Sequence, residues 1–293
     1  MKIIVTGSNG FLGRHLSLSL AGKGFEVHAL SRGESRFSPV KNICYHSLEL
    51  TDVRTVTQII RDLMPDAIVH TAALSKPDEC NADSEKCLAY NVEATRYLAD
   101  AAKNTNSHFV YISTDFIFGE DGPHSEDDEP GPLNFYGESK LRAEQLLQQS
   151  VLDHCIVRPV FIYGKCLEGM RPSFLHWVKN NLEQGKAIKV VTDQQRTPTY
   201  VGDLCAGITQ IIEHRTRGVY HLAGKNIVSP YEMALTVAKT LGLNSALIQP
   251  VTSDTFPEPV RRAKRSGLKI SKAIRELGYA PVDFEEGVRL SFL

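Results

Sequence analysis

Tyr136 and Lys140 form the most suggestive chemical pair in this sequence of 293 residues. They stand four positions apart in a stretch that reads as the start of a helix, so both side chains share one helix face. A phenol, with a reference pKa of about 10, is a poor acid or base at neutral pH, but a neighbouring ammonium favours the phenolate and lowers that pKa. The pair therefore predicts a proton donor for a carbonyl group that is reduced by hydride.

A hydroxyl group at the end of the preceding predicted strand strengthens this interpretation. Thr114 lies in the stretch Ser113-Thr114-Asp115, directly after a run of apolar residues. Its hydroxyl can bind the same carbonyl oxygen that Tyr136 protonates. Because Tyr-x-x-x-Lys spacing alone is common on helix surfaces, the strand-end hydroxyl is what makes the pair informative.

A glycine-rich turn follows the first predicted strand and opens a helix, where it can hold the phosphates of a dinucleotide. Glycine permits the tight turn and the close approach of the backbone to a pyrophosphate. The helix N-terminus adds free N–H groups and the positive end of a dipole. The alternative is a structural turn that binds no ligand. We expect cofactor contacts from Gly7, Ser8, Asn9, Gly10, Phe11, Leu12 and Gly13.

The end of the second predicted strand indicates which dinucleotide fits. An acidic residue there would bind the free 2′-hydroxyl of NAD, whereas this chain has Ser31 and Arg32, which suit the 2′-phosphate of NADP. We therefore expect NADP(H) in preference to NAD(H); alternatively, Arg32 only begins a solvated loop with Arg36 and Lys41. Asp52, after the third strand, either accepts a hydrogen bond from the adenine amino group or caps the next helix.

Alternating strands and helices must position these residues. Apolar strands that alternate with helices predict an α/β fold, a Rossmann-type doubly wound parallel sheet covered on both faces. Such a sheet binds ligands outside the carboxyl ends of its strands, where the residues above fall. The expected strands are 2–6, 26–31, 42–46, 67–70, 108–113 and 154–158, and the expected helices are 11–21, 53–63, 83–103 and 134–150.

The second half of the chain is less regular. We divide the chain into an NAD(P)-binding Rossmann domain, 1–159, and a smaller C-terminal α/β substrate-binding part, 160–293, some segments of which can return to the first domain. In the second part we expect helices at 174–184, 203–214, 230–241, 268–277 and 283–292, strands at 188–191 and 218–222, and a loop at 249–265.

The composition narrows the class of protein. With 33 basic and 34 acidic residues the formal net charge is −1, which lacks the basic excess of a general nucleic-acid binder. No apolar run approaches the roughly 20 residues needed to span a bilayer, and the N-terminal run is too short for a signal peptide, so we expect a cytoplasmic protein with no membrane partner. The spacings of the six cysteines match no zinc pattern, so we expect reduced thiols and no metal site.

The glycine turn, the strand-end hydroxyl and the Tyr-x-x-x-Lys pair, in that order, resemble the extended short-chain dehydrogenase/reductases. The resemblance is closest to the dTDP-4-dehydrorhamnose reductases and implies that Thr114, Tyr136 and Lys140 are catalytic, the last two also contacting the cofactor. A homodimer is a further expectation from the family. Matching stretches cover nearly the whole chain, at 113–115, 134–144, 193–194, 198–199, 218–224, 262, 266–268 and 271–272.

The same resemblance assigns residues around the nicotinamide and the proton relay. It implies that Thr71, Ala72, Ala73 and Asn91 line the cofactor or support the relay. The alternatives are a helix-capping Thr71 and a buried, satisfied Asn91.

Three residues are expected to contact the substrate, namely Asp115, Arg196 and Arg262, although the dTDP-4-dehydrorhamnose reductases have glycine where Arg196 stands. Arg196, with Val201 and Asp203, fits the Arg-x-x-x-x-Val-x-Asp pattern of sugar-nucleotide epimerases and dehydratases, whose arginine is expected to hold the substrate diphosphate. The alternative is a surface arginine in a loop. Arg262 is either a second phosphate contact or part of a solvated loop.

These implications predict NADPH-dependent reduction of a nucleotide-linked 4-keto-6-deoxy sugar, with hydride passing to C4, Tyr136 protonating the oxygen and Lys140 holding the nicotinamide ribose. A dehydratase of this family needs an Asp-Glu pair after the threonine, and Phe116 follows Asp115 here, which argues against dehydration. Two alternatives remain. One is an NAD(P)-binding sugar-nucleotide epimerase, which Arg32 opposes. The other is a non-catalytic NADP-binding subunit like the regulatory beta subunit of methionine adenosyltransferase.

Overall fold

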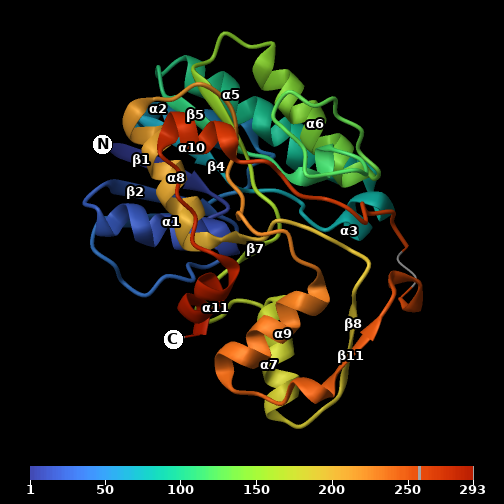
Figure 1. Cartoon of the computed structure of the whole chain (residues 1–293). Helices are drawn as coiled ribbons and strands as arrows, with labels where there is room; N and C mark the ends of the chain where they lie inside the picture. Colours follow the sequence, from blue (N-terminus) through green and yellow to red (C-terminus); the bar gives the residue numbers. More distant parts are fainter. Residues whose placement is uncertain (257–258, 293) are drawn as a thin grey trace.

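The structure, a computed structural model, describes residues 1–256 and 259–292 (Figure 1). Among these residues a parallel sheet of seven strands forms the centre of the larger part, in the order β10-β6-β5-β4-β1-β2-β3. The order runs outward from β1 to β3 and resumes at β4 on the other side of β1, so the sheet has a switch point between β1 and β4. The strands are β1 (Lys2–Thr6), β2 (Glu26–Ser31), β3 (Ile43–Ser47), β4 (Ala67–His70), β5 (His108–Ile112), β6 (His154–Arg158) and β10 (Gly218–His221).

Helices cover both faces of this sheet, which confirms the predicted Rossmann-type fold. Each helical layer shares a separate hydrophobic core with the sheet. Strands such as β4 are buried along their whole length, which explains why their sequences are apolar without alternation. One layer holds α1 (Phe11–Gly22), α8 (Val201–His214) and α10 (Ser271–Leu277); the other holds α2 (Val53–Leu63), α5 (Ala94–Lys103) and α6 (Phe135–Gln148).

A smaller part with its own core lies below the sheet in Figure 1. Because α8, β10 and α10 return to the large sheet, this part is assembled from segments that are separated along the chain. None of the helices among the described residues combines the length and apolar character needed to cross a bilayer. The smaller part contains α7 (Phe174–Glu183), α9 (Pro230–Leu241), α11 (Phe284–Phe292), the parallel pair β8 (Ile188–Val191) and β11 (Ile248–Val251), and the short pair β7 (Ile162–Tyr163) and β9 (Thr199–Tyr200).

The expected helix 83–103 is wrong in one respect, because it is interrupted. It begins as α4 (Ser84–Leu88), passes through a π-helical turn over Ala89–Glu93 and continues as α5. An additional short helix, α3 (Pro77–Ala82), precedes it. A π-helical turn places one extra residue in the turn, and such turns recur at functional sites.

The segment 249–265, expected to be a loop, overlaps the strand β11. Pro250 lies inside β11. A proline disfavours the prediction of a strand, because it lacks the N–H that a central strand needs. Within the described chain β11 pairs with β8 alone, so a proline is tolerated at this edge. Residues 257 and 258 of the segment lie outside the described residues.

Candidate active site

A cleft of about 760 Å³ opens at the carboxyl ends of β1, β2, β4 and β5, beside the switch point of the sheet. The structure thus brings the glycine turn, the strand-end hydroxyl and the Tyr–Lys pair into one site. Ser8, Asp52 and Asn91 belong to the described chain but stand outside its lining. The predicted residues that line it are Gly7, Asn9, Gly10, Phe11, Leu12, Gly13, Ser31, Arg32, Thr71, Ala72, Ala73, Thr114, Asp115, Tyr136 and Lys140.

The glycine turn forms a backbone cradle that side chains would fill. Gly7 has a φ of +65°, and a Cβ there would lie 2.7 Å from the Cα and N atoms of Ala72. A Cβ on Gly13 would lie 2.4 Å from the carbonyl oxygen of Gly7. The first turn of α1, from Phe11 to Gly13, lines the cleft and presents the N–H groups of a helix start. This arrangement fits a dinucleotide pyrophosphate.

The two polar residues of the turn hold it in place. Ser8 is buried, and its N–H donates to the carbonyl oxygen of Leu30 at 3.2 Å. The side-chain amide of Asn9 donates to the carbonyl oxygens of Arg32, at 3.2 Å, and Glu34, at 2.9 Å. These contacts join the turn to the loop after β2, so Ser8 and Asn9 shape the cradle through the backbone.

Two arginines stand beside the end of β2. Arg32 and Arg36 both line the cleft. The guanidinium of Arg32 donates to the hydroxyl of Tyr90 at 2.9 Å, lies 4.8 Å from the centroid of that ring, and is 3.6 Å from the Glu49 carboxylate. Its side chain is 63% exposed, so the group is positioned and still accessible to a phosphate.

Asp52 caps a helix. Its carboxylate accepts the N–H groups of Arg54 and Thr55, at 3.0 and 3.4 Å, and the Thr55 hydroxyl at 2.6 Å. The cleft wall nearby is formed by residues 48–50 instead. The structure therefore supports the capping alternative for Asp52 over a contact with adenine.

Asn91 and Thr71 act on the backbone around the cleft. Asn91 is buried in the π-helical turn, where its side chain accepts the N–H of Leu74 at 2.8 Å and donates to the carbonyl of Leu74 at 3.1 Å and to the Ser139 hydroxyl at 2.9 Å. The Thr71 hydroxyl donates to the carbonyl of Thr6 at 2.6 Å. Asn91 is thus a buried, satisfied residue that ties the segment after β4 to α6.

Thr114 and Tyr136 form the reactive centre of the cleft. Thr114 precedes the short 3-10 helix Asp115–Ile117, its hydroxyl donates to Asp115 Oδ1 at 3.2 Å, and its side chain lies beside that of Tyr136. Burial raises the pKa of Tyr136, and the contact with Thr114 opposes that rise in part; the lowering effect of Lys140 stays a prediction. Burial also raises the pKa of the Asp115 carboxyl, against the opposing charge of Arg196.

Lys140 follows Tyr136 by four residues on α6 and is almost fully buried. Its Nζ donates to the carbonyl oxygen of Ile112 at 2.7 Å and lies 4.1 Å from the ring centroid of Tyr111. Burial lowers the pKa of Lys140 to about 7, and the Glu144 carboxylate opposes that shift.

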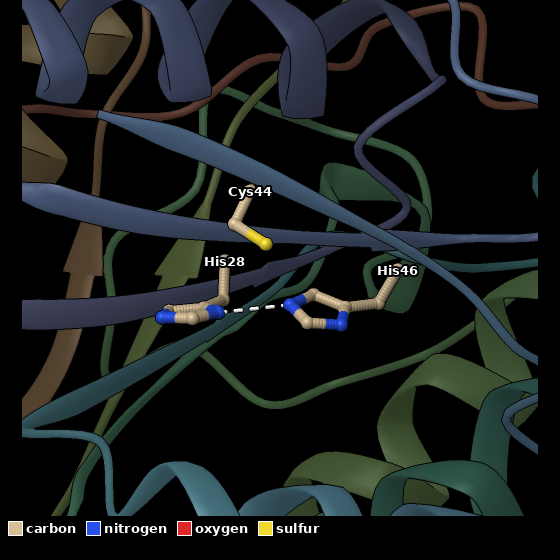
Figure 2. A group of neighbouring side chains, drawn as sticks. All are labelled: His28, Cys44 and His46. Atoms are coloured by element: carbon tan, nitrogen blue, oxygen red, sulfur yellow. Dashed lines mark hydrogen bonds between the residues drawn. The ribbon is translucent and has the colours of Figure 1, made fainter. Parts of the chain in front are cut away.

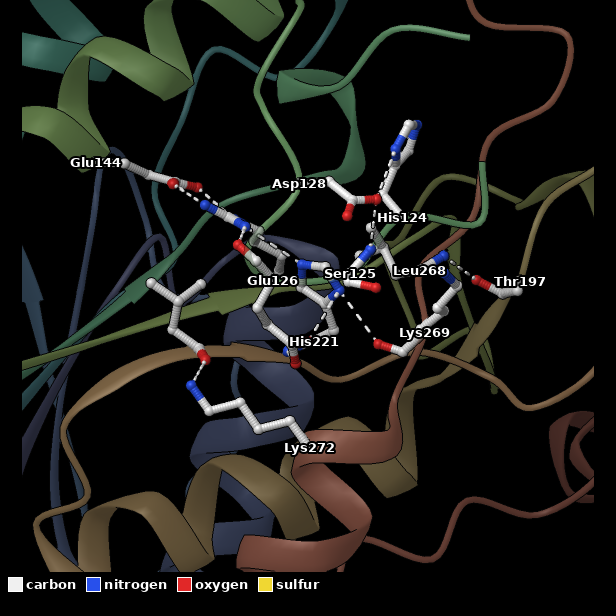
Figure 3. A network of polar contacts seen from close by, with 12 residues as sticks. His124, Ser125, Glu126, Asp128, Glu144, Thr197, His221, Leu268, Lys269 and Lys272 are labelled. Atoms are coloured by element: carbon white, nitrogen blue, oxygen red, sulfur yellow. Dashed lines mark hydrogen bonds and ion pairs between the residues drawn. The ribbon is translucent and has the colours of Figure 1, made fainter. Parts of the chain in front are cut away.

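A buried ion pair joins α6 to the end of β6. Arg158, at the end of β6, donates from Nε and Nη2 to the two carboxylate oxygens of Glu144, at 3.0 and 2.6 Å. His221 approaches the same guanidinium at 3.3 Å, and the Glu126 carbonyl accepts from it at 3.2 Å (Figure 3). This network fixes the ends of β6 and β10 next to α6.

A second pocket of about 260 Å³ adjoins the cleft and is lined by Arg196 and Arg262. Asp115, Phe116 and Phe161 line both cavities and mark where they meet. Arg196 lies over the Phe161 ring, at 5.5 Å from its centroid, and donates to Gln194 Oε1 at 2.6 Å. Arg262 is 3.1 Å from the Asp78 carboxylate. The three predicted substrate residues therefore surround one space next to Tyr136.

Several cleft residues escaped the sequence interpretation. Arg36, Tyr90 and Arg171 line the cleft. The sequence interpretation named Arg36 only as part of a solvated loop and assigned no role to Tyr90 or Arg171. A second arginine five residues after the end of β2 was the available signal for Arg36. Tyr90 precedes Asn91 in the π-helical turn, which the sequence pattern did not reveal.

Comparison with known proteins identifies the family. A family model described as the RmlD substrate binding domain matches residues 1–292. The chain belongs to this family. The resemblance to dTDP-4-dehydrorhamnose reductases, within the extended short-chain dehydrogenase/reductases, is therefore confirmed, and so is the expectation of an NAD(P)-dependent oxidoreductase at the level of the family.

The similar proteins include both enzymes and a subunit of another enzyme, by their names. The dTDP-4-dehydrorhamnose reductase of Mycolicibacterium smegmatis is 29% identical, over 98% of this chain and 84% of the relative. Methionine adenosyltransferase 2 subunit beta of Pongo abelii is 31% identical, over 90% of this chain and 78% of the relative. The crystal structure of dTDP-4-dehydrorhamnose reductase from Bacillus anthracis in complex with NADP is 28% identical, covers 99% of this chain and 98% of its own, and has a TM-score of 0.87.

Proposed function

We propose that this protein is an NADPH-dependent reductase of a nucleotide-linked 4-keto-6-deoxy sugar. The observation that carries the proposal is the placement of Thr114 and Tyr136 together in the wall of a dinucleotide-shaped cleft, where it meets a pocket lined by two arginines. A reductase of this kind needs those three features side by side.

The cradle of Gly7 and Gly13, with the first turn of α1, would hold the cofactor's pyrophosphate. Arg32 and Arg36 support NADP over NAD, because two cations beside Ser31 suit a 2′-phosphate and no carboxylate follows the strand directly. When bound, the reduced nicotinamide supplies the hydride.

The chain's own residues would position the substrate carbonyl and supply its proton. Tyr136, whose pKa burial raises, keeps its phenolic proton at neutral pH and can give it to the carbonyl oxygen. Thr114 would hold the same oxygen by a second hydrogen bond. Lys140, which also lines the cleft, would hold the nicotinamide ribose and return positive charge to the site as the phenolate forms.

The smaller part of the chain would bind the nucleotide end of the substrate. Arg196 and Arg262 can each offer a guanidinium to a diphosphate, for which their forked geometry is suited. Asp115, between the two cavities, would accept a sugar hydroxyl. This assignment makes residues 160–293 the main source of substrate contacts and 1–159 the main source of cofactor contacts.

The assay is the loss of NADPH absorbance with dTDP-4-dehydrorhamnose as substrate. Turnover by the natural chain and its loss in Tyr136→Phe, with NADPH binding retained, would support the proposal. Tyr97→Phe serves as the matched control and should turn over normally, because Tyr97 is half-buried on α5 and stands outside the lining of both cavities. Normal turnover by Tyr136→Phe would overturn the assignment.

A second function has support from one comparison, the 31% identity to methionine adenosyltransferase 2 subunit beta. In that case the chain would bind NADP tightly, turn over no nucleotide sugar and copurify with a second protein. A sugar-nucleotide epimerase would instead work with bound NAD, which the two arginines beside β2 oppose. The free state of all six cysteines supports a reducing, cytoplasmic location, and a homodimer stays a prediction from the family.

A further inference from the structure

Two histidines and a cysteine gather on one face of the sheet (Figure 2), and none of the three lines the cleft. His28 lies on β2 directly opposite Cys44 on β3, and His46 follows two residues along β3 on the same face. The Nδ1 atom of His28 is 2.8 Å from the Nε2 atom of His46. One nitrogen or sulfur atom from each of the three side chains lies within 4.8 Å of both others.

A carboxylate fixes the orientation of the buried member of this group. The Nε2 atom of His28 is 2.9 Å from the Oε1 atom of Glu26. Since a carboxylate accepts, Nε2 carries the proton and the lone pair of Nδ1 points toward His46. A carboxylate behind the outer nitrogen of a histidine is the support that metal-bound histidines usually have.

We propose that His28, Cys44 and His46 form a binding site for one Zn²⁺ ion, with water as the fourth ligand. Two imidazoles and a thiolate are donors that zinc prefers. Tetrahedral Zn–N bonds of about 2.0–2.1 Å and a Zn–S bond of about 2.3 Å place donor atoms roughly 3.3–3.6 Å apart. Separations of 4.8 Å or less reach that range by small side-chain rotations.

The burial of the three residues suits such a site. His28 is 7% exposed and held by Glu26, so it forms a rigid anchor. Cys44 is exposed and His46 is half-buried, so these two can adjust and leave a path for the ion from solvent. The anchor His28 lies on β2, which is paired on both sides because it runs between β1 and β3.

Binding involves no oxidation, and one proton leaves. The Cys44 thiol loses its proton to solvent as sulfur bonds to the ion, because zinc binds the thiolate. His46 donates the proton between the two imidazoles from its Nε2 atom. On binding, this proton moves to Nδ1 of the same ring, so Nε2 of His46 becomes free to bind the ion and no second proton is released. The site would fasten β3, the edge strand, to β2, whose end carries Ser31 and Arg32.

The expectation of no metal site rested on the spacing of cysteines along the sequence. The spacing of His28, Cys44 and His46 matches no known zinc pattern. His28 and Cys44 are 16 positions apart and meet only because β2 and β3 pair in this register. Residue spacing along one strand or loop reveals a zinc site; a site across two strands needs the register.

Cobalt serves as the spectroscopic probe, added to the full-length, chelator-treated protein. The proposal expects one Co²⁺ per chain with a thiolate-to-cobalt charge-transfer band, displacement of Co²⁺ by Zn²⁺, and release of about one proton per ion at neutral pH. Cys44→Ser should abolish the band and weaken binding by at least about tenfold. The Glu26→Gln variant should keep the band but bind Co²⁺ more weakly, because it loses only the carboxylate that orients His28.

Matched controls use the same residue types elsewhere on the surface. Cys166→Ser and His214→Gln should leave the band and the affinity unchanged. Because Cys44 is exposed, Cys44→Ser should melt at the same temperature as the natural chain without metal. A charge-transfer band that survives in Cys44→Ser, or equal affinity of this variant and the natural chain, would overturn the proposal. The readout does not depend on turnover and so tests the metal site separately from the proposed function.

Discussion

Removing the charge of Glu144 offers the sharpest test of the polar network behind the site. Glu144 is 1% exposed and Arg158 is 4% exposed, and two hydrogen bonds of 3.0 and 2.6 Å join them. Glu144→Gln leaves the guanidinium buried without a counter-charge, and breaking a buried pair from one side costs about 3–5 kcal/mol. Since glutamine keeps the shape and one acceptor, we expect a loss near 3 kcal/mol, a large part of a typical total of roughly 5–15 kcal/mol.

The assay is urea denaturation, with a surface ion pair on the same helix as the control. Glu138 and Arg142 are about half exposed, so Glu138→Gln should cost less than about 1 kcal/mol. Equal losses for Glu144→Gln and Glu138→Gln would refute the claim that the buried pair is a structural tie. The Glu144 carboxylate also raises the pKa of Lys140, so Glu144→Gln should move the titration of that lysine to lower pH.

Three further predictions follow from distances and pKa shifts at the cleft. Gly13→Ala places a Cβ 2.4 Å from the Gly7 carbonyl oxygen and should weaken NADPH binding in calorimetry by at least about tenfold, whereas Gly22→Ala, with open space around it, should bind normally. Burial lowers the pKa of Lys140 to about 7 from an unfolded value near 10.5, so the folded chain binds fewer protons than the unfolded chain between these two pH values. The free energy of unfolding of the natural chain, relative to that of Lys140→Met, should therefore rise with pH from about 7 to 10.5. A difference between the two chains that does not change with pH would contradict the lowered pKa. Arg32→Ala should weaken NADPH binding by about tenfold or more while leaving NADH binding unchanged, and an equal loss for both dinucleotides would remove Arg32 from phosphate recognition.

The parts of the site that could be predicted from sequence are those set by short-range geometry. The glycine turn, Thr114 and the Tyr136–Lys140 pair each follow or begin a regular element, and parallel strands bring such positions to one edge. Their convergence on one cleft therefore follows from the strand–helix alternation alone.

The parts that could not be predicted depend on tertiary register or on burial. The contacts of Tyr90 with Arg32 require the π-helical turn, which leaves no periodic signature in the residues around it. His28 and Cys44 meet only through the register of β2 and β3. The sequence allowed Asp52 to bind adenine or to cap the next helix. Its hydrogen bonds at the start of α2 support the capping role.

The direction of the Tyr136 pKa shift bears on which half of the redox reaction the site favours. A lowered pKa would make Tyr136 a base that takes a proton from an alcohol, and a raised pKa keeps it an acid that gives one to a carbonyl oxygen. Burial raises the pKa of Tyr136, while the ammonium of Lys140 is directed at the Ile112 carbonyl and the Tyr111 ring. Burial lowers the pKa of Lys140 to about 7, so a small change in its surroundings can protonate it. Negative charge that develops on the Tyr136 phenol would raise the proton affinity of Lys140 and so return positive charge to the site. Burial thus keeps Tyr136 as a protonated phenol at neutral pH, which is the form that can give a proton to a carbonyl oxygen.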